Sequence, residues 1–155
     1  VLGSGSTADA HHITAPAPGG DGALRCMQLA IEDAGLSSND IASINAHGTS
    51  TPLNDAAEAE ALSKLFGDNG PPVTSTKGIT GHALGAAGAI EATAVLLSFI
   101  HKQIPPTSGF TTPDPEMAEF NLVTGGPQDW EPGPSMSNSF GFGGHNGSIV
   151  LAPAE

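Results

Sequence analysis

The segment from Ala83 to His101 restricts the fold of this chain more than any other part of the sequence. It has the length of a helix, and apolar residues occupy nearly every side of it. A helix that is apolar all round lies inside a protein, because water would otherwise meet one of its faces. The segment is therefore predicted to be a buried helix that needs other elements packed around it.

The other predicted elements alternate between helices and strands. Apolar positions recur at three- and four-residue steps from 21 to 34, and Gly35 follows as a helix stop. Asp55 is predicted to cap a second helix over 56–66, which stops at Gly67. Short strands are expected at 40–46, 72–77, 135–140 and 147–152, the last two antiparallel. This order indicates an α/β layered fold in one domain, with 103–116 as an extended connector.

Charge and cysteine content exclude several classes of function. The 155 residues carry 4 Lys or Arg against 16 Asp or Glu, a formal net charge of -12. Nucleic acid is therefore not expected as a partner, because its phosphates need cationic contacts. The longest apolar run, near 92–100, is too short to span a bilayer, so no membrane partner is expected. One cysteine, Cys26, excludes an internal disulfide and favours a reducing compartment, the cytoplasm.

The first candidate motif is NAHGTSTPLND at 45–55. His47 follows a predicted strand, and strand ends are where α/β folds bind ligands. Thr49 and Thr51 lie two residues apart, so in an extended segment both hydroxyls point the same way. Such a pair can bind an amide-bearing ligand, and it can equally cap the helix that follows.

The second motif is STKGITGHALGAAGAIE at 75–91. His82 is predicted at the N-terminus of the apolar helix, where the helix dipole favours a neutral imidazole that can donate to an oxyanion. Lys77 flanks the same loop. Glu91 lies about two turns inside the helix, where a carboxylate needs a partner or a cation.

The third motif, SNSFGFGGHNG at 137–147, does not match a dinucleotide-binding loop, because Asn146 stands where that fingerprint needs glycine. It is better interpreted as a mobile flap that carries Phe140 and Phe142 on a glycine-hinged turn. The six histidines show no zinc-binding pattern, and Cys26, in the middle of a helix, is expected to be an inert structural thiol.

Together, and in this order, the three motifs resemble the C-terminal half of the β-ketoacyl-[acyl-carrier-protein] synthases, condensing enzymes of the thiolase-like superfamily. The HGTST form at 47–51 is similar to the type II elongating synthases of fatty acid synthesis. GGHN at 143–146 replaces the commoner GGTN, as in actinobacterial and mycolic-acid synthases. The resemblance covers essentially the whole chain. It implies a thiolase-like layered fold in which 1–155 form the C-terminal repeat, a mixed sheet with a buried central helix.

The resemblance also implies an activity: decarboxylative Claisen condensation of an acyl thioester with malonyl-ACP in fatty acid chain elongation. His47 and His82 would then donate hydrogen bonds to the malonyl thioester and stabilise its enolate. Lys77 would order this pair electrostatically, with Glu58 as its partner. Phe142 would gate the acyl pocket, and its backbone N–H would contribute to the oxyanion hole.

Further residues follow from the same resemblance. The substrate carries phosphopantetheine, and the residues expected to contact it are Thr49, Thr51, Thr14, His12 and Phe140. No cofactor is required. In some members of the family a structural monovalent cation is bound, and the residues that would surround it here are Asn45, Glu91, Ser137 and Asn138.

One part of the family's machinery has no counterpart in this sequence. The nucleophilic cysteine belongs to the N-terminal half, and Cys26 is not at the matching place. The expected partners are an acyl carrier protein, the N-terminal half that bears this cysteine, and a second copy of the full enzyme in a homodimer. Two alternatives stay open: an aromatic polyketide ketosynthase, and a catalytically inactive subunit similar to a chain-length factor.

Overall fold

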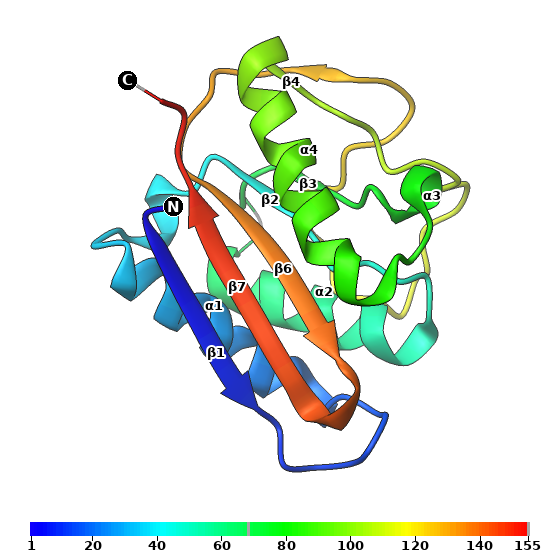
Figure 1. Cartoon of the computed structure of the whole chain (residues 1–155). Coiled ribbons are helices and arrows are strands. Elements are labelled where there is room, and N and C mark those ends of the chain that lie inside the picture. The colour runs from blue at the N-terminus through cyan, green and yellow to red at the C-terminus, as the bar shows by residue number, and fades with distance from the viewer. Residues whose placement is uncertain (68, 155) are drawn as a thin grey trace.

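A mixed five-stranded sheet separates two layers of helices in the computed structural model, which describes residues 1–67 and 69–154 (Figure 1). Across the sheet the strands are β1 (Gly3–Ala8), β7 (His145–Leu151), β6 (Ser135–Gly141), β2 (Ser43–Asn45) and β3 (Val73–Thr74). β7 runs antiparallel to both of its neighbours, whereas β2 runs parallel to β6 and β3. The predicted α/β class, with a mixed sheet, is confirmed.

The helices lie on both faces of this sheet. In Figure 1, α1 (Asp21–Asp33) and α2 (Pro52–Phe66) are behind it, and α4 (Ala87–His101) crosses its front. The smaller elements are α3 (Lys77–Thr80), the two-stranded sheet β4 (Gln103–Ile104) with β5 (Gln128–Asp129), and the 3-10 turns Pro18–Gly20, Ser38–Asp40, Leu84–Ala86 and Phe142–Gly144.

The main core lies between the sheet and the layer of α1 and α2. Met27 of α1, Ile44 of β2 and Met136 of β6 are fully buried there. β1 packs closely on α1 because it carries glycine: a Cβ at Gly5 would collide with the carbonyl oxygen of Cys26. A side chain at this position would force the edge strand away from the helix.

A second, smaller core lies under α4. Val95 and Phe99 pack against Leu151, and the Phe99 ring stacks on Trp130 with 5.8 Å between ring centroids. These contacts cover one side of α4 only. Its other side leaves large apolar side chains exposed, with relative exposures of 37% for Ile90, 46% for Leu96, 49% for Leu97 and 73% for Ile100.

The structure differs from the sequence analysis on whether any helix is long enough to span a membrane. The stretch Leu84–His101 comprises 18 residues of mean hydropathy 1.5, long and apolar enough to cross a membrane by length and composition. The core helices of soluble proteins pass the same test. Only 28% of this window is buried in this chain. Two features nevertheless distinguish α4 from a membrane span: the core that packs on its covered side, and Glu91, which is buried within that side.

Several predicted boundaries are wrong by a few residues. α2 begins at Pro52, so Asp55 stands in its first turn and does not cap it. The strand predicted at 72–77 is only Val73–Thr74, because Lys77 already begins α3. A 3-10 turn occupies the start of the predicted 83–101 helix, and β1 was not predicted.

The exposed side of α4 predicts self-association of this chain in isolation. Exposed apolar patches of this kind associate unless something covers them. A double variant that combines Leu97→Lys with Ile100→Lys should keep the chain folded and shift it to monomer in sedimentation velocity. In contrast, Val95→Lys should unfold it by circular dichroism, because Val95 is buried. A double variant that stays as associated as the parent chain would contradict this role of the face.

Candidate active site

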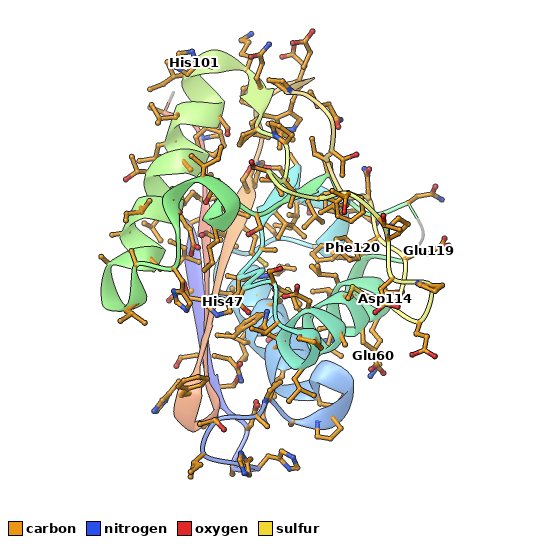
Figure 2. The ribbon with its side chains drawn as sticks, turned by 90° about the vertical axis from the view of Figure 1, so that its right-hand side faces the viewer. His47, Glu60, His101, Asp114, Glu119 and Phe120 are labelled. Carbon is orange, nitrogen blue, oxygen red and sulfur yellow. The ribbon has the colours of Figure 1, made fainter. Side chains whose placement is uncertain are left out.

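The three motifs meet at one end of the sheet, around His47. His47 follows the last residue of β2 by two positions, and its ring makes a T-shaped contact with His82, with ring centroids 5.5 Å apart. On another side the ring of Phe140 lies 5.9 Å away, centroid to centroid. Figure 2 places His47 in the middle of the molecule. Two imidazoles from separate motifs are therefore presented to one another.

His47 is held in its neutral form. The side chain is buried, and its Nδ1 has no hydrogen-bond partner among the described residues. Burial lowers the pKa of His47 to about 3, and the electrostatic influence of the neighbouring Lys77 and His82 adds to this effect. A neutral imidazole can donate one N–H to a ligand without bringing a charge into the site.

Glu58 of α2 fixes the backbone that carries His47. One carboxylate oxygen accepts the N–H of His47 at 2.9 Å and the other accepts that of Gly48 at 2.9 Å. Burial raises the pKa of Glu58, whereas these two hydrogen bonds lower it. Glu58 thus holds the loop and does not pair with Lys77, and the predicted Lys77–Glu58 partnership is wrong.

Lys77 pairs instead with Glu91. The ammonium group of Lys77 donates to Glu91 Oε1, and the two side chains are only 6% and 1% exposed. Burial raises the pKa of Glu91, while the hydrogen bond and charge of Lys77 lower it. Lys77 is therefore the partner that the sequence analysis predicted Glu91 to need. The ion pair also joins the start of α3 to α4.

His82 lies between α3 and the 3-10 turn, five residues before α4 begins, so it does not stand at the helix N-terminus as predicted. Its Nδ1 accepts the N–H of Leu84 at 3.3 Å. In a neutral imidazole the proton then resides on Nε2, which becomes the donor. His82 is exposed in this chain, in contrast to His47.

The threonine pair lies beside a groove that starts at these residues. The hydroxyls of Thr49 and Thr51 lie 2.8 Å apart, as the predicted common direction of their side chains requires. A groove of about 520 Å³ runs from Lys77 and His82 past Thr49 to the connector and to Phe120, which is labelled in Figure 2. Gly48 must be glycine here, because a Cβ would lie 2.6 Å from that of Ser75. The groove gives the Thr49 hydroxyl an open space that can receive an elongated ligand, and Thr51 reaches this space only through its contact with Thr49.

The flap is the turn Phe142–Gly144, and only one of the two predicted aromatic residues lies on it. Phe142 is 77% exposed, whereas Phe140 belongs to β6 and is half-buried against His47. His12 and Thr14, which were expected to contact phosphopantetheine, are exposed in the segment before α1. His12 Nδ1 accepts the backbone N–H of Thr14 at 3.1 Å. Neither residue lines the groove, so this chain alone does not bring them to the histidine pair.

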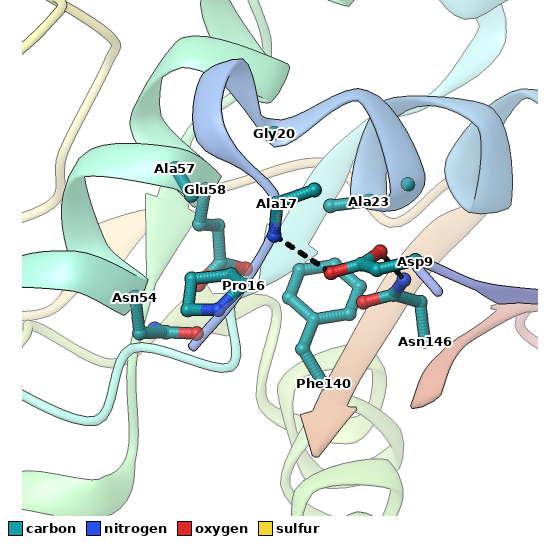
Figure 3. A pocket seen from close by; sticks show the side chains of 11 residues that line it. Asp9, Pro16, Ala17, Gly20, Ala23, Asn54, Ala57, Glu58, Phe140 and Asn146 are labelled. Atoms are coloured by element: carbon teal, nitrogen blue, oxygen red, sulfur yellow. Dashed lines mark hydrogen bonds between the residues drawn. The ribbon is translucent and has the colours of Figure 1, made fainter. Parts of the chain in front are cut away.

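A cluster that the sequence analysis missed surrounds Asp9 (Figure 3). Asp9 accepts hydrogen bonds from the Asn146 amide at 2.6 Å and from the backbone N–H of Ala17 at 2.9 Å. These groups line a cavity of about 20 Å³, room for about one water, together with Phe140 and Glu58. Asp9 and Asn146 are 137 positions apart, so no local pattern could have paired them.

Cys26 is inert, as the sequence predicts. It is fully buried in α1, its thiol donates to the carbonyl of Gly5 at 3.2 Å, and burial raises its pKa. A thiol that stays protonated is a poor nucleophile.

Comparison with known proteins identifies the family. Residues 1–111 match the family model described as β-ketoacyl synthase, C-terminal domain. The chain belongs to the β-ketoacyl synthase family. It is 46% identical over 157 aligned residues to 3-oxoacyl-[acyl-carrier-protein] synthase 2 of Staphylococcus aureus, an alignment that covers 100% of this chain and 38% of the relative.

Solved structures of ketosynthases have the same fold. A β-ketoacyl synthase from Burkholderia phymatum superposes with a TM-score of 0.94 at 38% identity, over 99% of this chain and 37% of that one. The ishigamide ketosynthase/chain length factor superposes with a TM-score of 0.94 at 36% identity, over 100% and 38%. The thiolase-like fold is thus confirmed. The chain spans less than half the length of each of these β-ketoacyl synthase relatives.

The cation set that the family implies fits this structure only in part. Asn45 Oδ1 and Glu91 Oε2 are buried without a hydrogen-bond partner among the described residues, so two oxygen ligands are available. Ser137 pairs with Asn45 in the parallel register and shares its face of the sheet. Asn138 points to the opposite face, where its side chain contacts Met27 and Ser148. Its side chain therefore does not belong to the predicted set.

The neutral state of His47 predicts a pH dependence. In this β-ketoacyl synthase domain His47 should stay neutral from about pH 8 to about pH 5, whereas in urea it should titrate near its ordinary value of about 6.5. Because the folded pKa is the lower one, stability should fall as pH decreases below the unfolded pKa. Imidazole 15N chemical shifts measure the protonation state, and a folded His47 that titrates above pH 5 would contradict the argument.

The buried Lys77–Glu91 pair predicts coupled losses of stability. Glu91→Gln and Lys77→Met each leave one buried group without its partner and should cost about 3–5 kcal/mol in urea unfolding. The double variant should lose less than the sum of the two. As a matched control, Glu60→Gln removes the exposed Lys64–Glu60 pair and should change little. Strictly additive losses would show that the two side chains do not interact.

Proposed function

We propose that the full-length protein catalyses the decarboxylative Claisen condensation of an acyl thioester with malonyl-ACP in fatty acid chain elongation. Residues 1–155 would be its C-terminal domain and would supply the decarboxylation half of the active site. The observation that carries this proposal is the contact between His47 and His82, with His47 neutral beside a buried ion pair. The 46% identity to a 3-oxoacyl-[acyl-carrier-protein] synthase supports the same reaction.

The arrangement suits an enolate. When malonyl thioester loses carbon dioxide, the electrons of the broken carbon–carbon bond pass into the thioester and place negative charge on its carbonyl oxygen. Neutral N–H donors held in a dry site stabilise such an oxygen strongly, because they need no reorganisation as the charge develops. His47 and His82 would be these donors. The enolate carbon then attacks the acyl thioester, expels its thiolate and forms the new carbon–carbon bond.

The surrounding residues have supporting roles in this proposal. Glu58 fixes the His47 backbone, and the Lys77–Glu91 pair places a positive charge near both imidazoles. Thr49 and Thr51 would bind the phosphopantetheine arm in the groove. Phe142 would gate the acyl pocket, with its backbone N–H in the oxyanion hole. A structural monovalent cation would be held by the oxygens of Asn45, Glu91 and Ser137, away from the reacting atoms.

The remaining parts of the enzyme would come from outside this segment. The nucleophilic thiol would lie in the N-terminal part, since Cys26 is buried and serves packing. The exposed side of α4 would pack on that part, and the complete enzyme would act in the cytoplasm as a homodimer that receives acyl carrier protein. Residues 1–67 and 69–154 contain no group of three His, Cys, Asp or Glu side chains placed to hold a metal.

A polyketide ketosynthase is the second candidate, and it has a specific observation in its favour. The ishigamide ketosynthase/chain length factor superposes over the whole chain. Both candidates use the same histidines, so the extended acyl product separates them. An inactive subunit is less well supported, because a subunit without chemistry has no reason to keep His47, Lys77 and His82 together.

The histidine pair gives the test of the proposal. In the full-length protein, His47→Ala or His82→Ala should slow release of carbon dioxide from malonyl-ACP by about 10²–10³, the usual effect of losing one oxyanion donor. Acylation of the thiol by acyl-ACP, followed by mass spectrometry, should survive better. Both rates should be unchanged in His101→Ala, which removes an exposed histidine at the far end of α4 (Figure 2).

Two outcomes would overturn the proposal. One is a His47 or His82 variant that keeps decarboxylation and loses acylation, because the two residues would then act in the other half-reaction. The other is condensation by the 155-residue chain alone, because the thiol would then have to be Cys26.

A further inference from the structure

The flap is held from one side by the segment before α1. The backbone N–H of Gly143 donates to the carbonyl of Ile13 at 2.8 Å, and the carbonyl of Gly144 accepts from the backbone N–H of Asp9 at 2.9 Å. Gly143 and Gly144 both have positive φ angles, 81° and 75°, which glycine adopts without strain. Phe142 projects from this turn almost fully exposed. Movement of the Phe142 backbone would therefore disturb the hydrogen bond that its neighbour Gly143 makes to Ile13.

The ring of His145 lies beside the other side of Gly143, and both residues are exposed. If Gly143 carried a Cβ, that atom would lie 3.2 Å from His145 Cδ2 and 3.3 Å from Nε2. The outer edge of the imidazole therefore fills the space into which a side chain at position 143 would project, and a Cβ there would lie closer than ordinary van der Waals contact.

His145 is itself attached to a rigid part of the molecule. It is the first residue of β7, and its backbone pairs with Ala8 of β1 and with Gly141 of β6. A side chain anchored between two strands moves less than the turn beside it. The flap glycine thus lies between a hydrogen bond to Ile13 and a ring that projects from the sheet.

We propose that His145 is a positioning residue for the flap: its imidazole buttresses Gly143 and slows the movement of Phe142. This inference rests on the gate assigned to Phe142 in the proposed function. It also gives a role to the GGHN variant of the third motif. A threonine, the commoner residue of the family at this place, is too short to reach the position of Cδ2 and Nε2, so it would leave that side of Gly143 free.

Slower movement of the flap should affect acyl transfer more than decarboxylation. Acyl transfer needs the flap to move, so the buttress limits how fast an acyl chain enters the pocket. Decarboxylation depends on the histidine pair, which lies after β2 and in the loop after α3 and not on the flap. A change at His145 should therefore alter acylation far more than release of carbon dioxide.

The test uses the full-length protein with 4-trifluoromethylphenylalanine at position 142. His145→Thr should raise the flap exchange rate from 19F NMR, and the acylation rate with a long acyl-ACP, by about threefold to tenfold. His145→Phe keeps a flat ring and should stay near the parent rates. His101→Ala is the matched control, and thermal melting with carbon dioxide release checks that each variant is folded and active.

Each outcome separates the inference from the proposed function. If Phe142→Ala alters acylation but His145→Thr leaves exchange and acylation unchanged, the buttress is wrong and the gate stands. If Phe142→Ala also leaves acylation unchanged, the gate itself fails. If His145→Phe behaves like His145→Thr, the contact of the ring with Gly143 does not control the flap, and the inference is overturned.

Discussion

The ion pair between Lys77 and Glu91 is the interaction on which the candidate site depends. A buried charge is tolerated only when it is paired, so each of these residues requires the other. Their pairing fixes the start of α3 against the first half of α4, and the intervening loop carries His82. The same ammonium group helps to keep the His47 imidazole neutral. One contact thereby helps to position one histidine and adds to the effect of burial that keeps the other neutral.

Much of the fold could be predicted from local patterns, and the failures have identifiable physical causes. The periodicity of α1, the pairing of β6 with β7 and the α/β order were all readable, because each follows from which residues avoid water. β1 was missed because its Gly- and Ser-rich sequence shows no apolar alternation, and its glycines serve a backbone contact with α1. The predicted starts of two helices were wrong. α2 begins earlier than predicted, at Pro52, and the first turn of the segment predicted as 83–101 is a 3-10 turn at Leu84–Ala86.

The site residues were recognised more easily than their partners. Motifs identified His47, Lys77 and His82, but the partner of Lys77 depends on which face of the sheet each acid occupies. Glu58 lies on α2, on the face that Asn138 also lines, whereas Glu91 comes from α4 on the other face. Successive residues of a strand point to opposite faces, so Ser137 and Asn138 could never share one site through their side chains. The alternation of side chains along β6 could have shown that Ser137 and Asn138 do not belong to the same cation site.

The first and last strands of the chain are hydrogen-bonded neighbours, since β1 pairs with β7 along its whole length and Leu2 donates to Val150 at 2.8 Å. Both ends of the chain consequently emerge beside one another, as Figure 1 shows. Because Gly3 pairs with Val150, segments joined to the start of β1 and to the end of β7 meet this domain at one end of the sheet. The motifs around His47 and His82 lie between those two strands in the sequence, whereas the apolar side of α4 stays exposed until another surface covers it.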